Sequence, residues 1–375
     1  MSNDKDKKDS FQYFDIEPWD QAIDSDKLYE LVRSTIARFI VATDEELVAI
    51  TLWVIHTYFI RHISEHQPFT HTPILHISSP ERGCGKSTLR EVLEQLTPRN
   101  LSLMNGSTAT IFRLIQKRLP TLFIDEADTF IENRVELIGV LNSGYTKHGK
   151  VFRQGGKQFE ETHEFSTWCA KCIIGIGNLP HTLQSRCIQI NLKRKMPSDT
   201  AERINEALDK DPNLFVNVKR CLVRFAIDQE SALLAVKIID NPRLDDRSQD
   251  NWRPLLKLAM LLGDDIFETA AEVSEVLAPI NHQEASLGVE LLGDIKILVD
   301  RHKDACISTQ EMILYLMSMD DRPWKNYQRK GLSAYDLSVF LKPYGIKPIQ
   351  FKLNGKVLRG YEIATFGDAF KRYLS

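Results

Sequence analysis

The sequence has little of three things that would assign it to a class at once. Its six cysteines are irregularly spaced and no apolar leader precedes them, which favours a reducing, cytoplasmic location over a disulfide framework. Its longest apolar run, 48–60, is well short of the roughly 20 residues that span a bilayer, so we expect no membrane segment. Its net charge is only −3, which gives no overall basic signal for nucleic acid.

The bulk composition is that of an ordinary globular protein. Hydrophobic residues make up 43% of the 375 and charged residues 26%, and the length allows two or three domains. The charge is unevenly distributed, because 322–375 contains 11 Lys and Arg against 3 Asp and Glu. One end of the chain is therefore locally basic.

The hydrophobic pattern divides the chain into five parts. Residues 1–24 have mixed charge without periodicity, as in a disordered tail, and 25–65 repeat apolar residues at helical spacing, as in a helical lead-in. From 66 to 195, short β-like runs alternate with helical stretches, which predicts an α/β core with a mostly parallel sheet between helices. Residues 196–280 read as a helical lid, in which Asn251-Trp252-Arg253-Pro254 is expected to open one helix, and 281–375 has a different rhythm. Within the core we expect strands at Ile74–Ser78, Thr121–Ile124, Lys171–Ile176 and Ile188–Leu192, and helices at Ser87–Leu96, Ala109–Arg118 and Glu132–Leu141.

The pattern of 281–375 predicts a small helical domain with a hairpin. Helices are expected to start at Ser308, Ser333 and Thr365, each followed three residues later by an acid, as in capping boxes. Asn354-Gly355, between the second and third starts, is flanked by alternating residues and predicts a tight hairpin. Three helices with a hairpin before the last predict a winged-helix domain, a common nucleic-acid-binding module.

A phosphate-binding loop is predicted at 74–88, ILHISSPERGCGKST, which reads as a strand, a glycine turn and the start of a helix. Backbone N–H groups and the helix dipole converge at such a turn and suit phosphate. Lys86 would reach the β/γ-phosphates of ATP and Ser87 would hold Mg²⁺. Pro80 replaces the first glycine of the usual pattern. The predicted nucleotide-binding residues are Gly83, Cys84, Gly85, Lys86, Ser87 and Thr88.

Polar residues follow two later apolar stretches, as expected for the rest of a nucleotide site. Thr121–Ile124 leads into Asp125 and Glu126, the Walker B form, in which Asp125 would bind Mg²⁺ and Glu126 would polarise the attacking water. Asn178 follows the next apolar stretch, where its side chain could touch the γ-phosphate or the lytic water. Arg186 precedes another strand, and an arginine supplied to a neighbouring subunit's ATP would stabilise the transferring phosphoryl group.

Each of these residues also has a simpler interpretation. The acids could form a salt-bridge cluster at a strand end, Asn178 could be a turn residue before Pro180, and Arg186 could be a surface ion-pair partner. The combination of the acids with a phosphate loop favours the nucleotide site. Cys169 and Cys172 form a C-x-x-C without two further zinc ligands at suitable spacing, so burial is the default for both.

The chain resembles an uncharacterised AAA+ family that is borne by phages, plasmids and genomic islands and is often found with primases. The resemblance covers nearly the whole chain after about residue 17 and rests on the order of the P-loop, FIDEADTF, LNSGYTKHGKVFR, FSTWCAKCIIGIGNLPHTLQSR, DNWRPLL, LKPYGI and GYEIATFGDAFKRYL. The core is also similar to the helicases typified by the minichromosome maintenance proteins and the superfamily-three viral initiators. The resemblance implies ATP and Mg²⁺ as cofactors, with the site residues Lys86, Ser87, Asp125, Glu126, Asn178 and Arg186 and the sensor-two candidates Arg247 and Arg253.

Two basic segments are candidates for DNA. Residues 147–165 read as a hairpin, in the place where the related helicases carry one, with Lys147, Lys150, Arg153 and Lys157 able to hold a phosphate backbone without reading sequence. The predicted wing offers Lys352, Lys356 and Arg359. The first segment could equally be a solvated basic loop, and winged helices also serve as protein-interaction modules.

These features predict an ATP-hydrolysing, ring-forming AAA+ motor that translocates on single-stranded or forked DNA as a replicative helicase of a mobile element. The expected assembly is a homo-oligomer, a hexameric ring, with a primase or another replication protein as a partner. A second hypothesis is an initiator, loader or defence-associated switch ATPase that does not unwind DNA. A third is a non-catalytic winged-helix DNA-binding protein.

Overall fold

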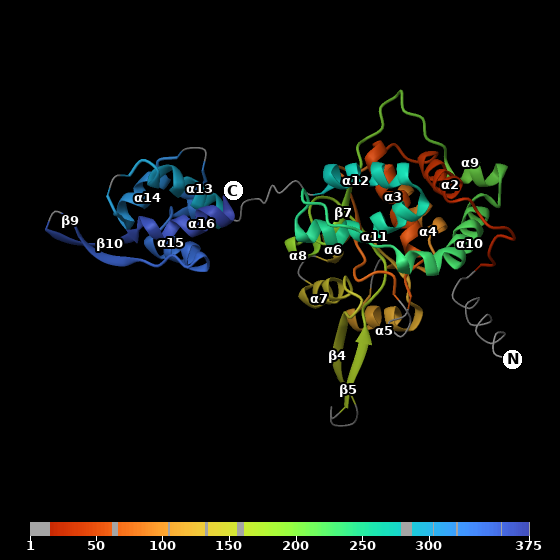
Figure 1. Ribbon diagram of the computed structural model, residues 1–375, viewed down its shortest axis with the longest axis horizontal. Coiled ribbons are helices and arrows are strands. Elements are labelled where there is room, and N and C mark those ends of the chain that lie inside the picture. The colour runs from red at the N-terminus through yellow and green to blue at the C-terminus, as the bar shows by residue number, and fades with distance from the viewer. Residues whose placement is uncertain are drawn as a thin grey trace. The chain divides into compact units, whose positions relative to one another are not determined.

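The protein consists of two compact units, Met1–Pro279 and Ile280–Ser375, each with its own hydrophobic core (Figure 1). The computed structural model describes residues 16–61, 67–103, 106–131, 134–155, 161–278, 287–302, 304–319, 322–353 and 355–374. No helix in these ranges has the length and apolar character needed to cross a membrane.

The first unit is built on a five-stranded parallel sheet between helices, as the alternation of β-like and helical stretches predicts. The strand order is β2-β3-β6-β1-β7, so β6 lies between β1 and β3. The strands are β1 (Ile74–Ser78), β2 (Asn100–Leu103), β3 (Thr121–Ile124), β6 (Lys171–Ile174) and β7 (Cys187–Asn191). The helices are α2 (Ser25–Ala37), α3 (Asp44–Thr57), α4 (Lys86–Leu96), α5 (Thr108–Arg118), α6 (Ala127–Phe130), α7 (Val135–Ser143), α8 (His181–Gln184), α9 (Ile204–Lys210), α10 (Leu214–Ala235), α11 (Asp246–Leu262) and α12 (Asp264–Leu277).

All four predicted strands form, although two of them differ from the prediction in their bounds. The bounds of β1 and β3 are as predicted, whereas β6 ends two residues early, before the left-handed turn at Gly177 (φ 78°). β7 begins one residue before its predicted start. β2 was not predicted, because this edge strand exposes part of its length and has no strong apolar run.

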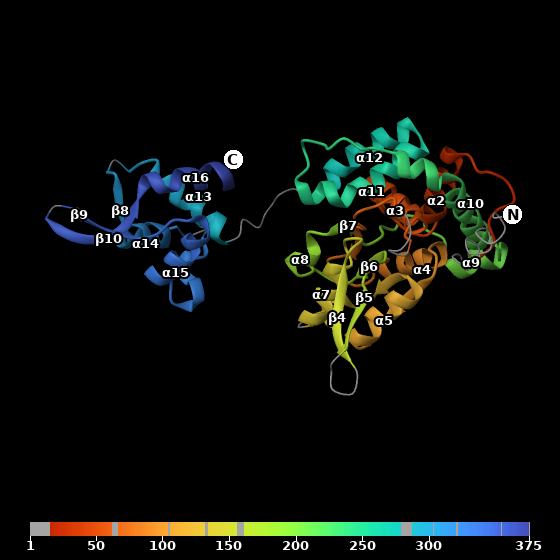
Figure 2. The ribbon, with the colours of Figure 1, turned by 60° about the horizontal axis from the view of Figure 1, so that its bottom comes forward.

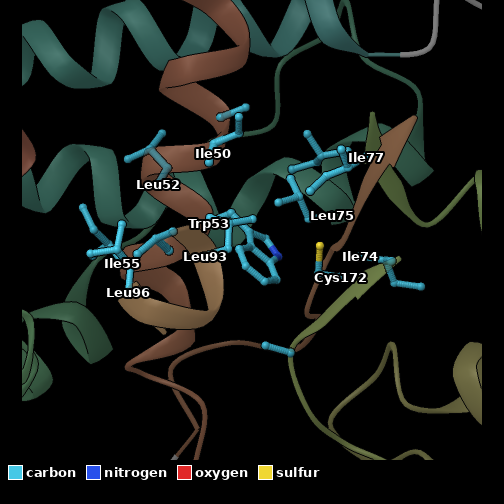
Figure 3. Packing of buried hydrophobic residues seen from close by; sticks show 14 of the residues in the cluster. Ile50, Leu52, Trp53, Ile55, Ile74, Leu75, Ile77, Leu93, Leu96 and Cys172 are labelled. Carbon is cyan, nitrogen blue, oxygen red and sulfur yellow. The ribbon is translucent and has the colours of Figure 1, made fainter. Parts of the chain in front are cut away.

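The apolar run 48–60 forms most of α3, a helix that is buried on all sides. A capping box starts the helix, in which the Thr43 hydroxyl accepts a hydrogen bond from the Glu46 N–H and the Glu46 carboxylate accepts one from the Thr43 N–H. Trp53 packs among residues of β1 and α4 (Figure 3), and its Nε1 donates to the Pro73 carbonyl at 3.1 Å. The helical lead-in is therefore part of the core that supports the sheet.

The lid helix α11 starts earlier than the sequence suggested. It begins at Asp246 instead of near Asn251, because the Asp245 side chain caps it by accepting from the Ser248 N–H at 2.7 Å. Pro254, which the sequence predicts in the first turn, therefore lies inside the helix. α11 packs against α3 and α12, so the lid and the lead-in form one helical layer.

The second unit combines helices with a three-stranded antiparallel sheet of order β8-β10-β9. Ser308 and Ser333 cap their helices as predicted, each accepting from the N–H three residues later. Thr365 does not, because a 3₁₀ turn precedes α16 and the Thr365 hydroxyl donates to the Glu362 carbonyl instead. The elements are α13 (Leu287–Val299), β8 (Cys306–Ser308), α14 (Thr309–Met317), η1 (Pro323–Arg329), α15 (Ala334–Leu341), η2 (Lys342–Tyr344), β9 (Ile349–Leu353), β10 (Lys356–Glu362), η3 (Ile363–Thr365) and α16 (Phe366–Tyr373).

Candidate functional site

The predicted phosphate loop joins the end of β1 to the start of α4. Gly83 (φ 80°) and Gly85 (φ 88°) take the left-handed conformation, which a residue with a Cβ rarely adopts. Position 80 is not left-handed, so Pro80 is compatible with this backbone. The Lys86 ammonium points into the turn and donates to the Ser79 hydroxyl and to the Glu81 carbonyl, the latter at 3.2 Å. The loop therefore gathers a cation and the N-terminus of an 11-residue helix at one place.

The two predicted acids follow β3 and have different surroundings. The Asp125 Oδ1 accepts from the Glu126 N–H at 2.9 Å, and its Oδ2 lies 3.3 Å from the Arg90 Nε. Arg90 also pairs with Glu94 at 3.0 Å, so it connects α4 to the acid. Glu126 is exposed and has φ 52° and ψ 44°, a strained conformation for a residue other than glycine.

Strand order brings the predicted residues of the nucleotide site to one edge of the sheet. β1, β6 and β3 are neighbours and parallel, so the Lys86 loop, Asn178 and the acids Asp125 and Glu126 all follow strand ends on the same side. Asn178 lies in the exposed turn after β6, between the other two. Ligands of open α/β sheets bind at this carboxyl edge, where the strand order reverses.

Arg194 is a further cation at this edge that the sequence did not single out. A Cβ built on Gly83 would lie 3.8 Å from the Arg194 guanidinium. The approach depends on β7, which pairs with β1 along its length and carries the chain past the loop, where the Leu192 N–H donates to the Ser78 carbonyl at 2.9 Å. The basic run 193–195 gave the only signal in the sequence, and such runs are usually solvated.

A pocket of about 550 Å³ adjoins the predicted loop residue Thr88. Its walls come from α4, from Phe39 in the turn after α2, from Lys195, and from 201–206 at the start of α9. It is wide enough for a nucleoside-sized group, and its lining combines an aromatic ring with two cations and three carboxylates.

Arg186 lies at the opposite edge of the sheet, where the strands begin. Its carbonyl accepts from the Ile74 N–H, at the first residue of β1. Its guanidinium contacts the Tyr145 ring, with 5.6 Å between Cζ and the ring centroid, and donates to the Thr182 carbonyl. Burial, and then the charge of Arg247, lower the pKa of Arg186. Since β1 separates the two edges, Arg186 does not approach the Lys86 loop of its own chain.

The two sensor-two candidates also lie at this starting edge. The Arg247 Cζ lies 5.3 Å from the centroid of the Tyr145 ring, so Arg247 and Arg186 contact the same ring. The Tyr145 hydroxyl is fixed by donating to the Asn251 Oδ1 at 2.8 Å. Arg253 pairs with Asp240 and lines a pocket with 68–70, the segment leading to β1. The structure does not bring either arginine to the loop residues 83–88 of the same chain.

The expected hairpin forms from β4 (Lys150–Gly155) and β5 (Glu161–Ser166), and it projects from the core beside α5 and α7 (Figures 1 and 2). Two of its expected DNA-binding cations have carboxylate partners, since Lys150 pairs with Glu164 and Arg153 pairs with Glu136. The neighbouring residue Lys147 is half-buried. Lys157 lies outside the described residues.

The hairpin carries an exposed aromatic side chain that the sequence did not predict. Phe152 is 59% exposed on the face that carries Lys150 and Glu164. The other face packs on α5, where Phe165 contacts Phe112 at 4.8 Å. Exposed aromatic rings are the usual stacking platforms for single-stranded bases. The exposed aromatic group is therefore a stronger feature of the hairpin than its net charge.

The expected cations of the second unit occupy both faces of the β9–β10 hairpin. Side chains alternate along β10, so Val357 and Arg359 share one face and Lys356 points to the other. Lys352 is paired with Val357 and lies on the Arg359 face. These residues do not form one continuous basic surface.

All six cysteines of the chain are free thiols, and five of them are buried. The described residues contain no cluster of His, Cys, Asp and Glu that could hold a metal ion. Cys169 and Cys172 are fully buried beside Lys171, whose ammonium donates to the carbonyls of Gly144 and Cys169 at 2.7 and 2.8 Å. The C-x-x-C pair therefore belongs to the core.

Residues 191–373 match a family described as "Protein of unknown function (DUF3631)". The match covers slightly less than half of the chain and begins at the last residue of β7. It includes the lid helices and the second unit, and it leaves out the Lys86 loop, the two acids and Arg186.

A curated relative from Saccharopolyspora erythraea, "Uncharacterized 28.9 kDa protein in xis 5'region", is 32% identical over 133 residues, or 35% of this chain. The match covers 50% of that protein, so the chain spans about half the length of the curated relative it matches. Two solved structures are similar at 12% identity. "The A form apo structure of NrS-1 C terminal region-CTR" has a TM-score of 0.42 and covers 93% of this chain and 78% of that one. "The A form apo structure of NrS-1 C terminal region-CTR(305-718)" has a TM-score of 0.40, with 93% and 77% covered. None of these descriptions names an activity.

Proposed function

We propose that the protein is an ATP-hydrolysing AAA+ motor that assembles as a ring and translocates on DNA, as a replicative helicase of a mobile element. One observation carries the proposal. The Lys86 loop, Asn178 and the acids Asp125 and Glu126 follow three neighbouring parallel strands and meet at one edge of the sheet. A cation, an amide and two carboxylates at the N-terminus of a helix form a site suited to phosphoryl transfer.

The residues of this edge fit a nucleoside triphosphate with Mg²⁺. The N–H groups of 83–88 and the Lys86 ammonium would bind phosphate, and Arg194 would add a second cation in the same chain. The Ser87 hydroxyl and the Asp125 carboxylate are the hard oxygen ligands that Mg²⁺ prefers. The metal would supply charge neutralisation at the β- and γ-phosphates, and the base and ribose would occupy the pocket beside Thr88.

Within such a site the chain's own groups have distinct roles. Glu126 would accept a proton from the attacking water, and Asn178 would orient that water or hold the γ-phosphate. Arg90 would position Asp125 by its contact with the second carboxylate oxygen. Arg90 was not predicted, because its role depends on the approach of α4 to the end of β3.

Hydrolysis in this proposal requires a second subunit. Arg186 and Arg247 contact one tyrosine ring at the edge opposite to Lys86, so both would serve the ATP of a neighbouring copy. In a ring, the edge of one subunit where the strands begin would face the carboxyl edge of the next subunit. The assembly that we propose is a hexamer. Arg253, paired with Asp240, would act through the lid.

DNA would pass along the β4–β5 hairpin. Phe152 is the exposed aromatic group there and would stack on bases, and Lys157 is the cation that we propose holds the backbone. The second unit has the order helix, strand, two helices and hairpin, and we infer that it is a winged-helix domain. A primase or another replication protein is the proposed partner of the assembly.

The first experiment separates the motor from the alternatives. ATP hydrolysis is measured with and without a forked duplex, together with strand displacement, for the wild type and Lys86→Ala. We expect hydrolysis that DNA stimulates, displacement that requires ATP, and loss of both in Lys86→Ala. Hydrolysis without stimulation or displacement would favour the switch ATPase, and an absence of hydrolysis would favour the non-catalytic DNA-binding protein.

The second experiment tests the shared site. Glu126→Gln subunits lack the water-polarising carboxylate and Arg186→Ala subunits lack the trans cation, and we expect each to be inactive alone. Mixing the two should restore part of the activity, because some interfaces then combine an intact Glu126 with an intact Arg186. If mixtures at every ratio stay inactive, Arg186 does not act in trans.

A further inference from the structure

A groove of about 670 Å³ opens on the surface of the second unit. Its walls are α14, α15 and β10, and all of its lining residues are described. In both views of the ribbon, α14, α15 and β10 belong to the same compact body (Figures 1 and 2). Nothing in the proposed ATPase cycle uses this groove.

Large apolar side chains at the groove are exposed to solvent. Leu314 on α14 is 63% exposed, Tyr335 on α15 is 76% exposed and Val357 on β10 is 61% exposed. One such residue is normal on a protein surface, but three around one concavity mark an interaction site. A tyrosine at such a position is typical of binding hot spots.

The charge around the groove has one sign. Arg359 is the only ionisable cation among the lining residues, and no Asp or Glu lines the groove. No carboxylate of the described residues forms an ion pair with Arg359, and Lys352 lies on the same face of the β9–β10 hairpin. An occupant that is complementary to this groove therefore has apolar anchors and at least one carboxylate.

The same surface is poorly suited to a phosphate backbone. The sequence of α15, AYDLSVFL, has no Lys or Arg, and it contributes the exposed Tyr335 and Val339 to the surface. Its acid, Asp336, belongs to the capping box with Ser333. Winged-helix proteins read DNA with the helix that α15 corresponds to, and such readers present cations and polar groups.

We propose that the groove formed by α14, α15 and β10 is a docking site for a short segment of a partner protein with apolar anchors and an acidic residue. Leu314, Tyr335 and Val357 contact the anchors, and the Arg359 guanidinium pairs with the carboxylate. A helix laid in the groove places anchors on one face at positions i, i+3 or i+4 and i+7. The second unit then recruits a protein, while DNA contact belongs to the first unit.

The experiment selects binders without assuming a partner. A random 16-residue peptide library displayed on phage is panned against the full chain, and enriched peptides are measured by fluorescence anisotropy. We expect peptides with two or three large apolar residues and at least one Asp or Glu. Tyr335→Ser and Leu314→Ser should weaken their binding at least tenfold. Val339→Ala is the matched control, because Val339 is exposed on the same helix but does not line the groove.

A second pair of variants tests the charge without touching the apolar contacts. Arg359→Glu should weaken the binding of the acidic peptides at least fivefold. Lys356→Glu, on the opposite face of β10, should change their affinity less than twofold. Peptides that bind Tyr335→Ser and Leu314→Ser as tightly as the wild type would overturn the proposal. A library that gives no acidic, apolar consensus would also overturn it.

A DNA arm distinguishes the other class of macromolecule. A fluorescent 20-base-pair duplex is titrated with the wild type and the same variants at two salt concentrations. We expect Tyr335→Ser and Leu314→Ser to bind the duplex within twofold of the wild type. If both weaken duplex binding fivefold or more while Val339→Ala does not, the groove is a nucleic-acid surface and the proposal is wrong.

Discussion

Single residues at the carboxyl edge of the sheet are held in conformations that their own chemistry does not favour. Glu126 is the clearest, because its φ of 52° and ψ of 44° put its Cβ close to the following carbonyl. It occupies the position before α6 and donates its N–H to the Asp125 Oδ1, and this hydrogen bond fixes one acid relative to the other. Strain of this kind gathers at functional sites.

Replacing Glu126 with glycine should separate stability from activity. Glu126→Gly relieves the left-handed conformation, and we expect it to raise the free energy of unfolding by about 1 kcal/mol while hydrolysis is lost. Urea unfolding and an ATPase assay measure the two effects. Glu126→Ala is the control, since it removes the carboxylate and keeps the strain. Equal stability of the two variants would show that the conformation costs nothing.

Two buried histidines should make the first unit sensitive to acid. Burial lowers the pKa of His56 to about 3 and that of His76 to about 4, from about 6.5 in the unfolded chain. Both are neutral in the folded state. Their contribution to the free energy of unfolding is therefore complete above pH 6.5, and it is lost as the pH falls towards their pKa values in the folded state. Each histidine should lower the free energy of unfolding by about 2 kcal/mol when the pH is reduced from 7.5 to 5.

The measurement is urea unfolding at those two pH values. His76→Leu and His56→Leu should each reduce the loss on acidification, because the variant side chain does not titrate. His163, exposed on the β4–β5 hairpin, provides the control in His163→Gln. A loss on acidification that neither leucine variant reduces would exclude these histidines as its source.

At the scale of elements, the β4–β5 hairpin shows how cross-strand pairing changes the meaning of a basic segment. Lys150 and Arg153 were expected to face DNA, yet Glu164 and Glu136 neutralise them within the fold. Phe152 lies on the face that carries Lys150 and Glu164, with 59% of its side chain exposed. The hairpin is therefore better placed to stack on bases than to follow phosphates.

Variants of the hairpin should show that base stacking contributes more to DNA binding than the paired cations do. Phe152→Ala removes a stacking platform worth about 1–3 kcal/mol per base, and we expect binding of an oligo-dT strand to weaken at least fivefold. Lys150→Ala should weaken it less than twofold, because the Lys150 charge is already paired with Glu164. Anisotropy titrations at two salt concentrations measure both. A larger effect of Lys150→Ala would make the hairpin an electrostatic contact.

At the scale of the molecule, the chain has two cores that share no residue. The second core contains Asp294, whose side chain is fully buried and accepts hydrogen bonds from Trp324 at 2.7 Å and from Arg322 at 3.1 Å. The proposed ATPase site lies wholly in the first unit and the docking groove wholly in the second. Damage to one unit should therefore leave the other folded.

Asp294→Ala tests this independence in the full chain. Removing the carboxylate leaves the buried Trp324 N–H without its acceptor and breaks the ion pair with Arg322, so we expect a cost of about 3 kcal/mol to the second unit. Differential scanning calorimetry should show one transition lowered and the other unchanged. Asp300→Ala, which removes an exposed pair with Lys296, should change neither by more than about 0.5 kcal/mol. A common shift of both transitions would show that the units unfold together.

The sequence by itself determined what local pattern and turn chemistry can specify. The apolar runs predicted β1 and β3, Ser308 and Ser333 predicted helix starts, and Gly83 and Gly85 predicted the turn of the loop. Each of these depends on neighbours a few residues away. The edge strand β2 and the true start of α11 were missed, because their signals are weak until other elements pack against them.

Only the tertiary structure decided which distant residues meet. The order β2-β3-β6-β1-β7 puts Asn178 between Lys86 and Asp125, and the packing of α4 and β7 adds Arg90 and Arg194 to that edge. The same topology separates Arg186, Arg247 and Arg253 from the loop. A sequence records spacing along the chain, whereas the side of a sheet on which a residue lies depends on strand order and direction. The spacing can be read from the sequence, whereas the side of the sheet is decided only when the strands pair.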